Sequence, residues 1–289
     1  MTFKSTFVSA LVLICALGFV AHADLEYTLV TTYSSAKKAP NPKQTPSSYK
    51  ETDTYYVTNN KSRWEHESGN QTYTAKEISI TRCDLNQRFH VDNALKIYTV
   101  SALDAKGKIS QPTEKELKEN LPTGKIETHY SLQEIGAEKI KGIDTKIYQL
   151  KITGKYSGIV AGHGSDYNGK IWVADLQRNV SCDLPDAMPK SYTQIEALST
   201  GKRKMIYENT GDVDAMNQLS SKLPLRGIGT AEGQTVSGEV TSISQDKLND
   251  SIFDIPAGYR KVSSDEYENL RSDAEDKAIL KTQNSKAHR

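Results

Sequence analysis

The sequence lacks the residue clusters that mark metal centres and many enzymes. It has only 3 cysteines and 6 histidines among 289 residues, and no zinc-type spacing such as HExxH or CxxC. Acidic and basic residues nearly balance, at 36 and 37. A nearly neutral chain has no overall field that attracts nucleic acid, so the charge balance argues against a nucleic-acid partner. The scarcity and spacing of Cys and His argue against a metal site.

Motifs for catalysis and cofactor binding are also missing. The segment Gly162–Asp166 places His, Ser and Asp side by side, but the members of a catalytic triad act from separate elements, so neighbours in sequence have the wrong geometry. Gly227, Gly229 and Gly233 miss the dinucleotide-binding spacing by one residue. The sequence therefore predicts no catalytic, cofactor-binding or metal-binding residue, and a function that is not enzymatic.

One apolar run stands out, and it lies at the N-terminus. Lys4 precedes the run Phe7–Val20, and Ala21–Ala23 has small residues at the positions that signal peptidase reads. The 14 residues of the run fall short of the roughly 20 needed to cross a membrane as a helix. We expect residues 1–23 to be a cleaved signal peptide, the mature chain from Asp24 to contain no transmembrane segment, and the protein to be periplasmic or secreted.

Cleavage would leave two cysteines, Cys83 and Cys182. An oxidising compartment favours their pairing. A bridge between them would close a loop of about 100 residues and stabilise the fold by up to about 4.7 kcal/mol in the chain-entropy model. The alternative of two separate buried thiols stays open, because the sequence does not tell whether the two positions meet in space.

Period-two alternation of apolar residues recurs along the mature chain, which is typical of strands with one face on a core. It is clearest from Leu25 to Tyr33. Further strands are expected around Tyr55, Ile78, Phe89, Tyr98, Tyr148–Ile152, Ile171–Ala174 and Met205–Tyr207, with a last pair formed by Val236–Ser244 and Ile252–Tyr259. Between them, the proline-rich segment 36–48 and the glycine-rich segment 154–169 predict loops.

Helix signals interrupt the strand pattern in three places. The first follows a capping residue, Thr113, and stops near Pro122. The second is Asp212–Leu219, with Asp212 as its cap and Pro224 as its end. The third begins at the capping box of Ser263, and we expect residues 263–289 to be a charged tail that is helical or frayed.

Tyrosine is abundant, with 15 residues against 5 phenylalanines. Its amphipathic rings can line a cavity. Tyrosine also has a high strand propensity on a half-buried sheet surface, so both interpretations remain open at this point.

Three segments, Gly142–Leu150, Lys170–Asp175 and Phe253–Tyr259, occur in an order that resembles a family of exported bacterial proteins. That family is known as a domain of unknown function and is similar to the periplasmic lipoprotein carriers LolA and LolB. The resemblance covers most of residues 50–262. It implies a mainly β (α+β) fold, in which a curved antiparallel sheet forms an incomplete barrel with a few short covering helices, and a LolA-like half-barrel domain over residues 24–262.

The resemblance also implies an exported, non-enzymatic binding or carrier-like protein that holds a lipid, another apolar ligand or a lipoprotein partner on an apolar concave face. The alternative is a structural or interaction module of the cell envelope, in which the sheet is filled by its own side chains. A continuous apolar cavity would favour the first and a filled interior the second. The oligomeric state is left open.

Overall fold

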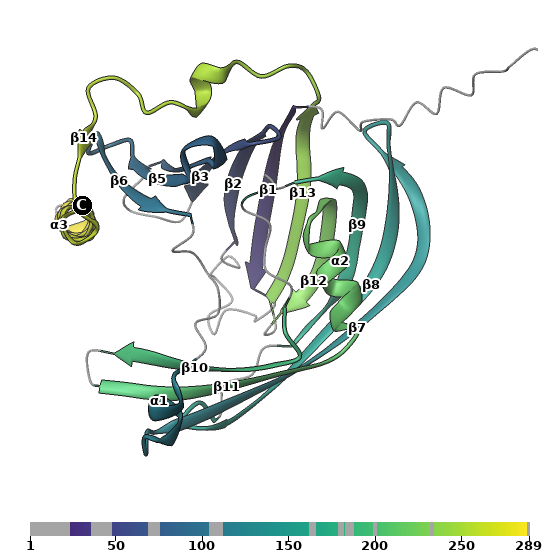
Figure 1. The fold of residues 1–289 in the computed structure, drawn as a ribbon. Helices are drawn as coiled ribbons and strands as arrows, with labels where there is room; N and C mark the ends of the chain where they lie inside the picture. The colour runs from purple at the N-terminus through teal and green to yellow at the C-terminus, as the bar shows by residue number, and fades with distance from the viewer. Residues whose placement is uncertain are drawn as a thin grey trace, which may run out of the picture.

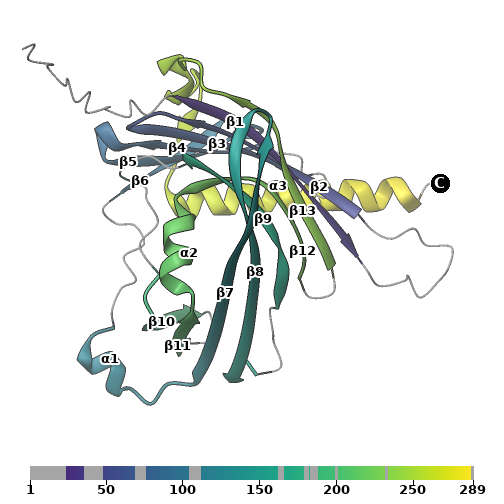
Figure 2. The same cartoon turned by 90° about the vertical axis from the view of Figure 1, so that its right-hand side faces the viewer.

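The molecule consists mostly of β-strands (Figures 1 and 2). The computed structural model describes residues 24–35, 48–68, 76–103, 112–161, 166–178, 182, 188–198, 201–231 and 234–287. The predicted signal peptide, residues 1–23, and all but the last residue of the predicted loop 36–48 lie outside the described residues.

The described elements follow one another as a long series of strands with three α-helices. The strands are β1 (Leu25–Ser35), β2 (Ser48–Val57), β3 (Lys61–Ser68), β4 (Glu77–Arg82), β5 (Gln87–Asp92), β6 (Ile97–Ala102), β7 (Thr123–Ile140), β8 (Ile143–Gly158), β9 (Tyr167–Gln177), β10 (Ser191–Leu198), β11 (Gly201–Gly211), β12 (Lys222–Ala231), β13 (Gln234–Ser244) and β14 (Arg260–Lys261). The helices are α1 (Glu114–Lys118), α2 (Val213–Ser220) and α3 (Ser264–Ala287), with short 3-10 turns η1 (Cys83–Leu85) and η3 (Asp250–Phe253).

All of these strands belong to one 14-stranded sheet, in the order β10-β11-β7-β8-β9-β12-β13-β1-β2-β3-β4-β5-β6-β14. The edge strands β10 and β14 do not pair with each other, so the sheet is not closed into a barrel. The mainly β class is confirmed. The expectation of an antiparallel sheet is wrong for two pairs, β7 with β11 and β6 with β14, which run parallel. The partners in both pairs are separated in the chain by other segments, whereas a hairpin would force an antiparallel pair.

The longest strands, β7 and β8, form a hairpin over 18 and 16 residues. Their turn consists of Lys141 and Gly142, whose φ angles are 50° and 82°. Two consecutive positive φ angles match the twist of the flanking strands and fix their register.

Strands extend into the segment 154–169 that we expected to be a loop. β8 continues to Gly158, and β9 already begins at Tyr167. Gly158 has a φ of +68°, and a Cβ there would lie 2.2 Å from the Thr123 carbonyl oxygen. This glycine therefore serves the close pairing of β7 with β8. Residues 162–165 lie outside the described residues.

The expected last strand pair is also wrong. β13 pairs with β1 and β12, and Ile252–Tyr259 forms no strand with it. The segment instead begins with η3, where the Asn249 side chain accepts a hydrogen bond from the Ser251 N–H at 3.0 Å. The alternating apolar residues of this segment pack on the sheet: Phe253 is buried against Ile78, Ile80 and Val91.

Strand β3 has no counterpart among the expected strands. Its centre contains the charged residues Arg63 and Glu65 on either side of Trp64, so the strand shows no alternation of apolar residues. Glu65 is nonetheless buried, because Arg63 and Lys76 neutralise it at 2.6 and 2.5 Å. An ion-paired carboxylate thus occupies a buried strand position, where apolar alternation would predict an aliphatic residue.

The two shorter helices lie where helices were expected, with one difference in capping. Thr113 and Glu116 form the capping box of α1. Asp212 is the N-cap residue of α2, as expected, but its side chain makes no capping hydrogen bond; its carboxylate accepts a hydrogen bond from the Leu132 N–H at 2.7 Å instead. α2 ends at Ser220, and Pro224 lies inside β12 beside a register shift.

Helix α3 occupies most of the predicted tail. Its first turn is capped by Ser263, whose hydroxyl accepts a hydrogen bond from the Glu266 N–H at 3.2 Å. Tyr267 is its one buried residue among those whose side chains are described. None of the described helices has the length and apolar character needed to span a membrane.

The two sides of the sheet carry different elements. We call the side on which α2 and α3 lie in Figure 1 the inner face, and the side covered by η3 the outer face. Figure 2 shows α3 along its length. In β4 and β5 the apolar residues Ile78, Ile80 and Val91 point to the outer face, where Phe253 covers them.

Candidate functional site

Of the 15 tyrosines, 14 belong to the described residues, and ten of these lie on the inner face of the sheet. Directly paired residues of neighbouring strands point to the same face, so the register assigns each tyrosine to a side. The ten are Tyr27, Tyr33, Tyr49, Tyr55, Tyr130, Tyr148, Tyr156, Tyr167, Tyr192 and Tyr207. They come from seven strands that together span the sheet from β10 to β2.

Three pairs of these tyrosines stack across neighbouring strands. Tyr27 and Tyr33 of β1 stack on Tyr55 and Tyr49 of β2, with ring centroids 4.6 Å apart in both pairs. At the far side of the sheet, Tyr192 and Tyr207 stack at 4.5 Å. Such pairs stabilise a sheet beyond the area they bury.

Aliphatic residues fill the positions between the tyrosines. They include Leu29, Ile126, Leu132, Leu150, Ile152, Ile171 and Val236. Tyr27 and Leu150 are buried, whereas the other tyrosines and aliphatic residues named here remain half-buried. A contiguous aromatic and aliphatic surface that is only partly covered is typical of a binding surface.

Two glycines shape the middle of this surface. Gly169 of β9 and Gly229 of β12 are direct partners. A Cβ on Gly169 would come within 2.5 Å of the Tyr167 hydroxyl, and one on Gly229 within 2.6 Å of the Tyr167 ring. Because Gly169 and Gly229 have no side chains, the Tyr167 ring can lie flat along the sheet over them.

Four of the inner-face tyrosines, Tyr27, Tyr33, Tyr55 and Tyr207, have raised pKa values and stay protonated at physiological pH. Burial raises the pKa of Tyr33, Tyr55 and Tyr207 to about 12, and it raises the pKa of Tyr27 further. Neutral phenols can donate and accept hydrogen bonds but do not act as nucleophiles at neutral pH. The chemistry of this face is therefore suited to binding an apolar group.

A second part of the inner face lies under α3 and is polar. One cross-strand row continues from Tyr27 and Tyr55 through Trp64 and Ser79 to His90 and Thr99. At the end of the row formed by His90 and Thr99, a pocket of about 280 Å³ lies between the sheet and α3. The pocket is lined by Trp64, Glu77, Ile78, His90, Thr99, Ser101, Ser264, Tyr267, Glu268 and Arg271.

Charged groups of the pocket are partly paired. Arg271 forms an ion pair with Glu77 and a second one with Glu275 at 3.2 Å. Within the described residues, Glu268 has no ion pair. Burial, followed by the nearby charge of Arg88, lowers the pKa of His90, so this imidazole is neutral at pH 7.

Trp64 is held in place at the wall of the pocket. Its indole N–H donates a hydrogen bond to the Asp53 carboxylate at 2.8 Å. The same carboxylate oxygen lies 2.9 Å from Nδ1 of His66. The Trp64 ring is therefore fixed from the side of the tyrosine-rich surface.

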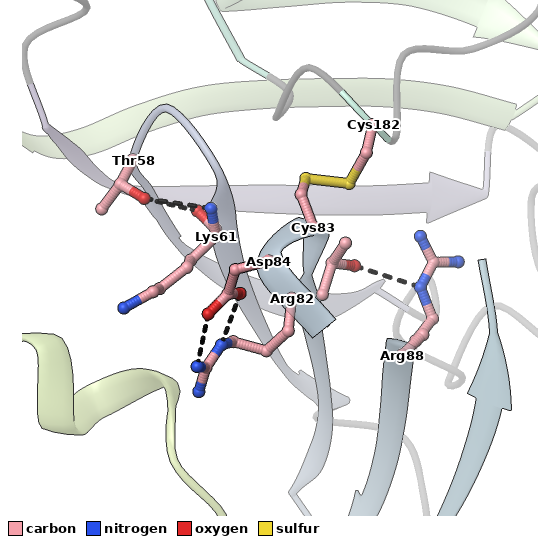
Figure 3. The surroundings of a disulfide bond; sticks show 8 residues. Thr58, Lys61, Arg82, Cys83, Asp84, Arg88 and Cys182 are labelled. Atoms are coloured by element: carbon pink, nitrogen blue, oxygen red, sulfur yellow. Dashed lines mark hydrogen bonds and ion pairs between the residues drawn. A yellow bond between two sulfur atoms is a disulfide. The ribbon is translucent and has the colours of Figure 1, made fainter. Parts of the chain in front are cut away.

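Cys83 and Cys182, the pair favoured by the sequence, form a disulfide in the structure (Figure 3). Their Cα atoms are 5.6 Å apart across a sequence separation of 99 residues. Cys83 begins η1 between β4 and β5, and the neighbouring Arg82 and Asp84 form an ion pair at 2.6 Å. The bridge thus connects the β4 side of the sheet with the chain that follows β9.

The motifs considered and set aside in the sequence analysis form no site in the described residues. No group of His, Cys, Asp and Glu side chains among them could hold a metal ion. Gly162–Ser165 lies outside the described residues, and the Asp166 carboxylate accepts a hydrogen bond from the Gly154 N–H at 3.3 Å. Gly227 and Gly229 are ladder positions of β12.

The sequence patterns predict none of the inner-face residues as site residues. Alternation within a strand could have placed Tyr27 and Tyr33 on one face. The register between strands brings the tyrosines of different strands together on one face, and no comparable signal in the sequence predicts that register. No protein-family model and no curated protein matches the chain, so the function is argued from the inner face itself.

Proposed function

We propose that the chain is an exported, periplasmic or secreted binding protein of LolA-like shape, which holds an apolar ligand or the acyl chain of a lipidated partner on the inner face. No step of this function requires a catalytic residue. The proposal concerns the surface formed by β7 to β13 with β1 and β2.

The observation that carries the proposal is the half-buried aromatic surface. Ten tyrosines and several aliphatic residues face the same side of the sheet, and nine of the ten tyrosines are only half-buried. A surface that served stability alone would bury these rings more completely, since the hydrophobic gain grows with the apolar area removed from water. An acyl chain laid on the surface would complete this burial.

The position of the disulfide supports a curved, barrel-like shape. β9 and β4 are six places apart in the sheet, which corresponds to about 29 Å on a flat sheet. Only three residues lie between Arg178, just after β9, and Cys182, and the four steps from one to the other span at most about 14 Å. A Cα distance of 5.6 Å between Cys83 and Cys182 therefore favours a sheet that bends toward its inner face, as an incomplete barrel does.

Export is supported by the same bridge together with the N-terminal pattern. A disulfide between distant segments is typical of oxidising compartments. N-terminal sequencing of the protein recovered from the periplasm or the medium should begin at Asp24. A mature protein that retains residues 1–23 would contradict the signal peptide.

A second candidate function is a structural module of the cell envelope. It is favoured by the stacked pairs, in which Tyr27 lies on Tyr55 and Tyr192 on Tyr207. If α2 and the stacked rings fill the concave side, the sheet needs no ligand.

Lipid extraction distinguishes the two functions. We would purify the exported protein without detergent, extract it with organic solvent and analyse the extract by mass spectrometry, and titrate the delipidated protein with a fluorescent fatty acid. The binding function predicts a co-purified acyl compound and saturable probe binding. Absence of both would leave the structural module as the better account.

A pair of variants locates the binding surface. Tyr167→Ala removes a central ring of the inner face, and we expect it to weaken probe binding about tenfold. Ile228→Ala removes an apolar side chain from the outer side of the adjacent strand, where it is 48% exposed. Equal effects of both variants would contradict binding on the inner face.

A further inference from the structure

We infer that the pocket under α3 binds a cationic amine or quaternary ammonium group, the polar head of the ligand whose apolar part lies on the tyrosines. The inference rests on the proposed function, and it adds the chemical class of the ligand. It follows from the continuity of the inner face, the charge of the pocket and its aromatic wall.

The pocket is a continuation of the tyrosine-rich surface. Tyr55 and Trp64 are direct partners on β2 and β3, and Trp64 lines the pocket. The row beyond Trp64 changes from aromatic to polar at Ser79 and His90. An elongated ligand that follows the row would pass from an apolar to a polar environment, which is the arrangement that an amphipathic molecule needs.

The free charge of the pocket is negative. Arg271 is the one cationic side chain that lines the pocket, and it is already paired with Glu77 and Glu275. Arg88, whose charge acts on His90, does not line the pocket. Glu268 lines the same pocket and makes no ion pair with the described residues. His90 is neutral and adds no positive charge. A cation is therefore the charge that the pocket would attract.

The aromatic wall of the pocket favours the same chemistry. Trp64 from β3 and Tyr267 from α3 approach the pocket from two sides, and Tyr267 is buried. Aromatic faces attract cations, and quaternary ammonium groups are commonly bound by aromatic side chains. The volume of about 280 Å³ suits a head group or a small amine, because drug-sized ligands occupy larger pockets.

Three probes separate the head group from the tail. Decyltrimethylammonium carries a tail and a cation, decanoate carries the same class of tail with an anion, and choline carries the cation without the tail. Each is titrated calorimetrically into the full-length mature protein at pH 7, below its micelle concentration. The variant Glu268→Gln removes the unpaired charge of the pocket, and Asp273→Asn removes a matched charge on the exposed side of α3 that does not line the pocket.

We expect decyltrimethylammonium to bind more tightly than either of the other probes. Glu268→Gln should weaken its binding about fivefold and leave decanoate binding unchanged, whereas Asp273→Asn should change neither. The inference is overturned if Glu268→Gln affects both tailed probes equally, if Asp273→Asn has the same effect, or if decanoate binds more tightly than decyltrimethylammonium. If neither tailed probe binds, the proposed function fails; choline binding that depends on Glu268 would then mark the pocket as a site for a free amine.

Discussion

The two regions of the sheet differ in the face that carries most of their apolar residues. In β4 to β6, Ile78, Ile80 and Val91 point to the outer face and are sealed by Phe253, which is 1% exposed. In β8 and β9, the outer face carries the polar partners Gln149 and Lys170 beside the apolar partners Ile147 and Trp172, whereas tyrosines and aliphatic residues such as Tyr148, Leu150 and Tyr167 point inward. The smaller region completes its core with its own chain. The larger region has a buried cluster that includes Tyr27, Leu225 and Val240, but it leaves nine of its ten inner-face tyrosines half-buried.

This contrast separates stability from function. A substitution on the sealed outer face of β4 to β6 removes packing that has no other partner, so it should act on unfolding. A substitution on the half-buried inner face removes less packing and should act on binding. Four changes to the chain test this division, and they are given in order of decreasing effect.

The disulfide joins the two regions, and its loss should have the largest effect. For a loop of the observed 99-residue separation, replacing both Cys83 and Cys182 by Ser should lower the free energy of unfolding by up to about 4.7 kcal/mol. Urea unfolding of the variant should match that of the reduced wild type. Mass mapping that finds both native thiols free to alkylate would contradict the bridge.

Phe253→Ala should destabilise the protein by about 3 to 5 kcal/mol, because it empties the site between Ile78, Ile80 and Val91. Thermal unfolding measures the loss. At a temperature where the variant is folded, its affinity for the fatty-acid probe should equal that of the wild type. A marked loss of affinity would show that the two faces are coupled.

The ion pair of Glu65 should make stability depend on pH. Burial alone would raise the pKa of Glu65, but the hydrogen bonds and charges of Lys76 and Arg63 outweigh it and lower the pKa below 4.5. A carboxyl whose pKa is lower in the folded state contributes its full stability above the unfolded pKa and loses it as the pH falls through the folded pKa.

Glu65→Gln should therefore cost about 2 kcal/mol at pH 7. The difference from the wild type should shrink as the pH falls below about 4.5. Unfolding curves at several pH values measure it. Glu67→Gln is the control, because Glu67 is exposed and also contacts Lys76, at 3.2 Å; an equal effect of both would contradict the role of burial.

Tyr207→Phe should have the smallest effect. It removes the hydrogen bond that the Tyr207 hydroxyl donates to the Glu196 carboxylate at 3.0 Å, and keeps the stacking on Tyr192. We expect a loss of about 1 kcal/mol in the free energy of unfolding with unchanged probe binding. A larger loss of binding than of stability would assign this hydroxyl to the ligand site.

The sequence predicts the strand-rich class and many strands because alternation is a local property. Leu25 to Tyr33 form β1 as expected, and Thr113 caps α1. The same reasoning fails at Ile252–Tyr259, where the alternating apolar residues pack on the outer face without entering the sheet. A side-chain pattern cannot distinguish these cases, since both bury every second residue.

The candidate site depends on information that is not local. Tyr167 and Tyr27 share a face only because β12 and β13 lie between their strands in a fixed register. The pocket requires α3 to lie beside His90, although the first residue of the helix, Ser264, follows His90 by 174 positions in the chain. Neither arrangement follows from composition or periodicity.

Oxidative footprinting of tyrosines measures whether the ligand lies on the inner face. The protein is exposed to hydroxyl radicals with and without bound fatty-acid probe, and the oxidation of each tyrosine is quantified by mass spectrometry. We predict that inner-face residues such as Tyr148 and Tyr167 are protected when the probe is bound, whereas Tyr56 and Tyr98 on the outer face react equally in both samples. Protection of the outer tyrosines, or no protection of the inner ones at saturating probe, would contradict the account.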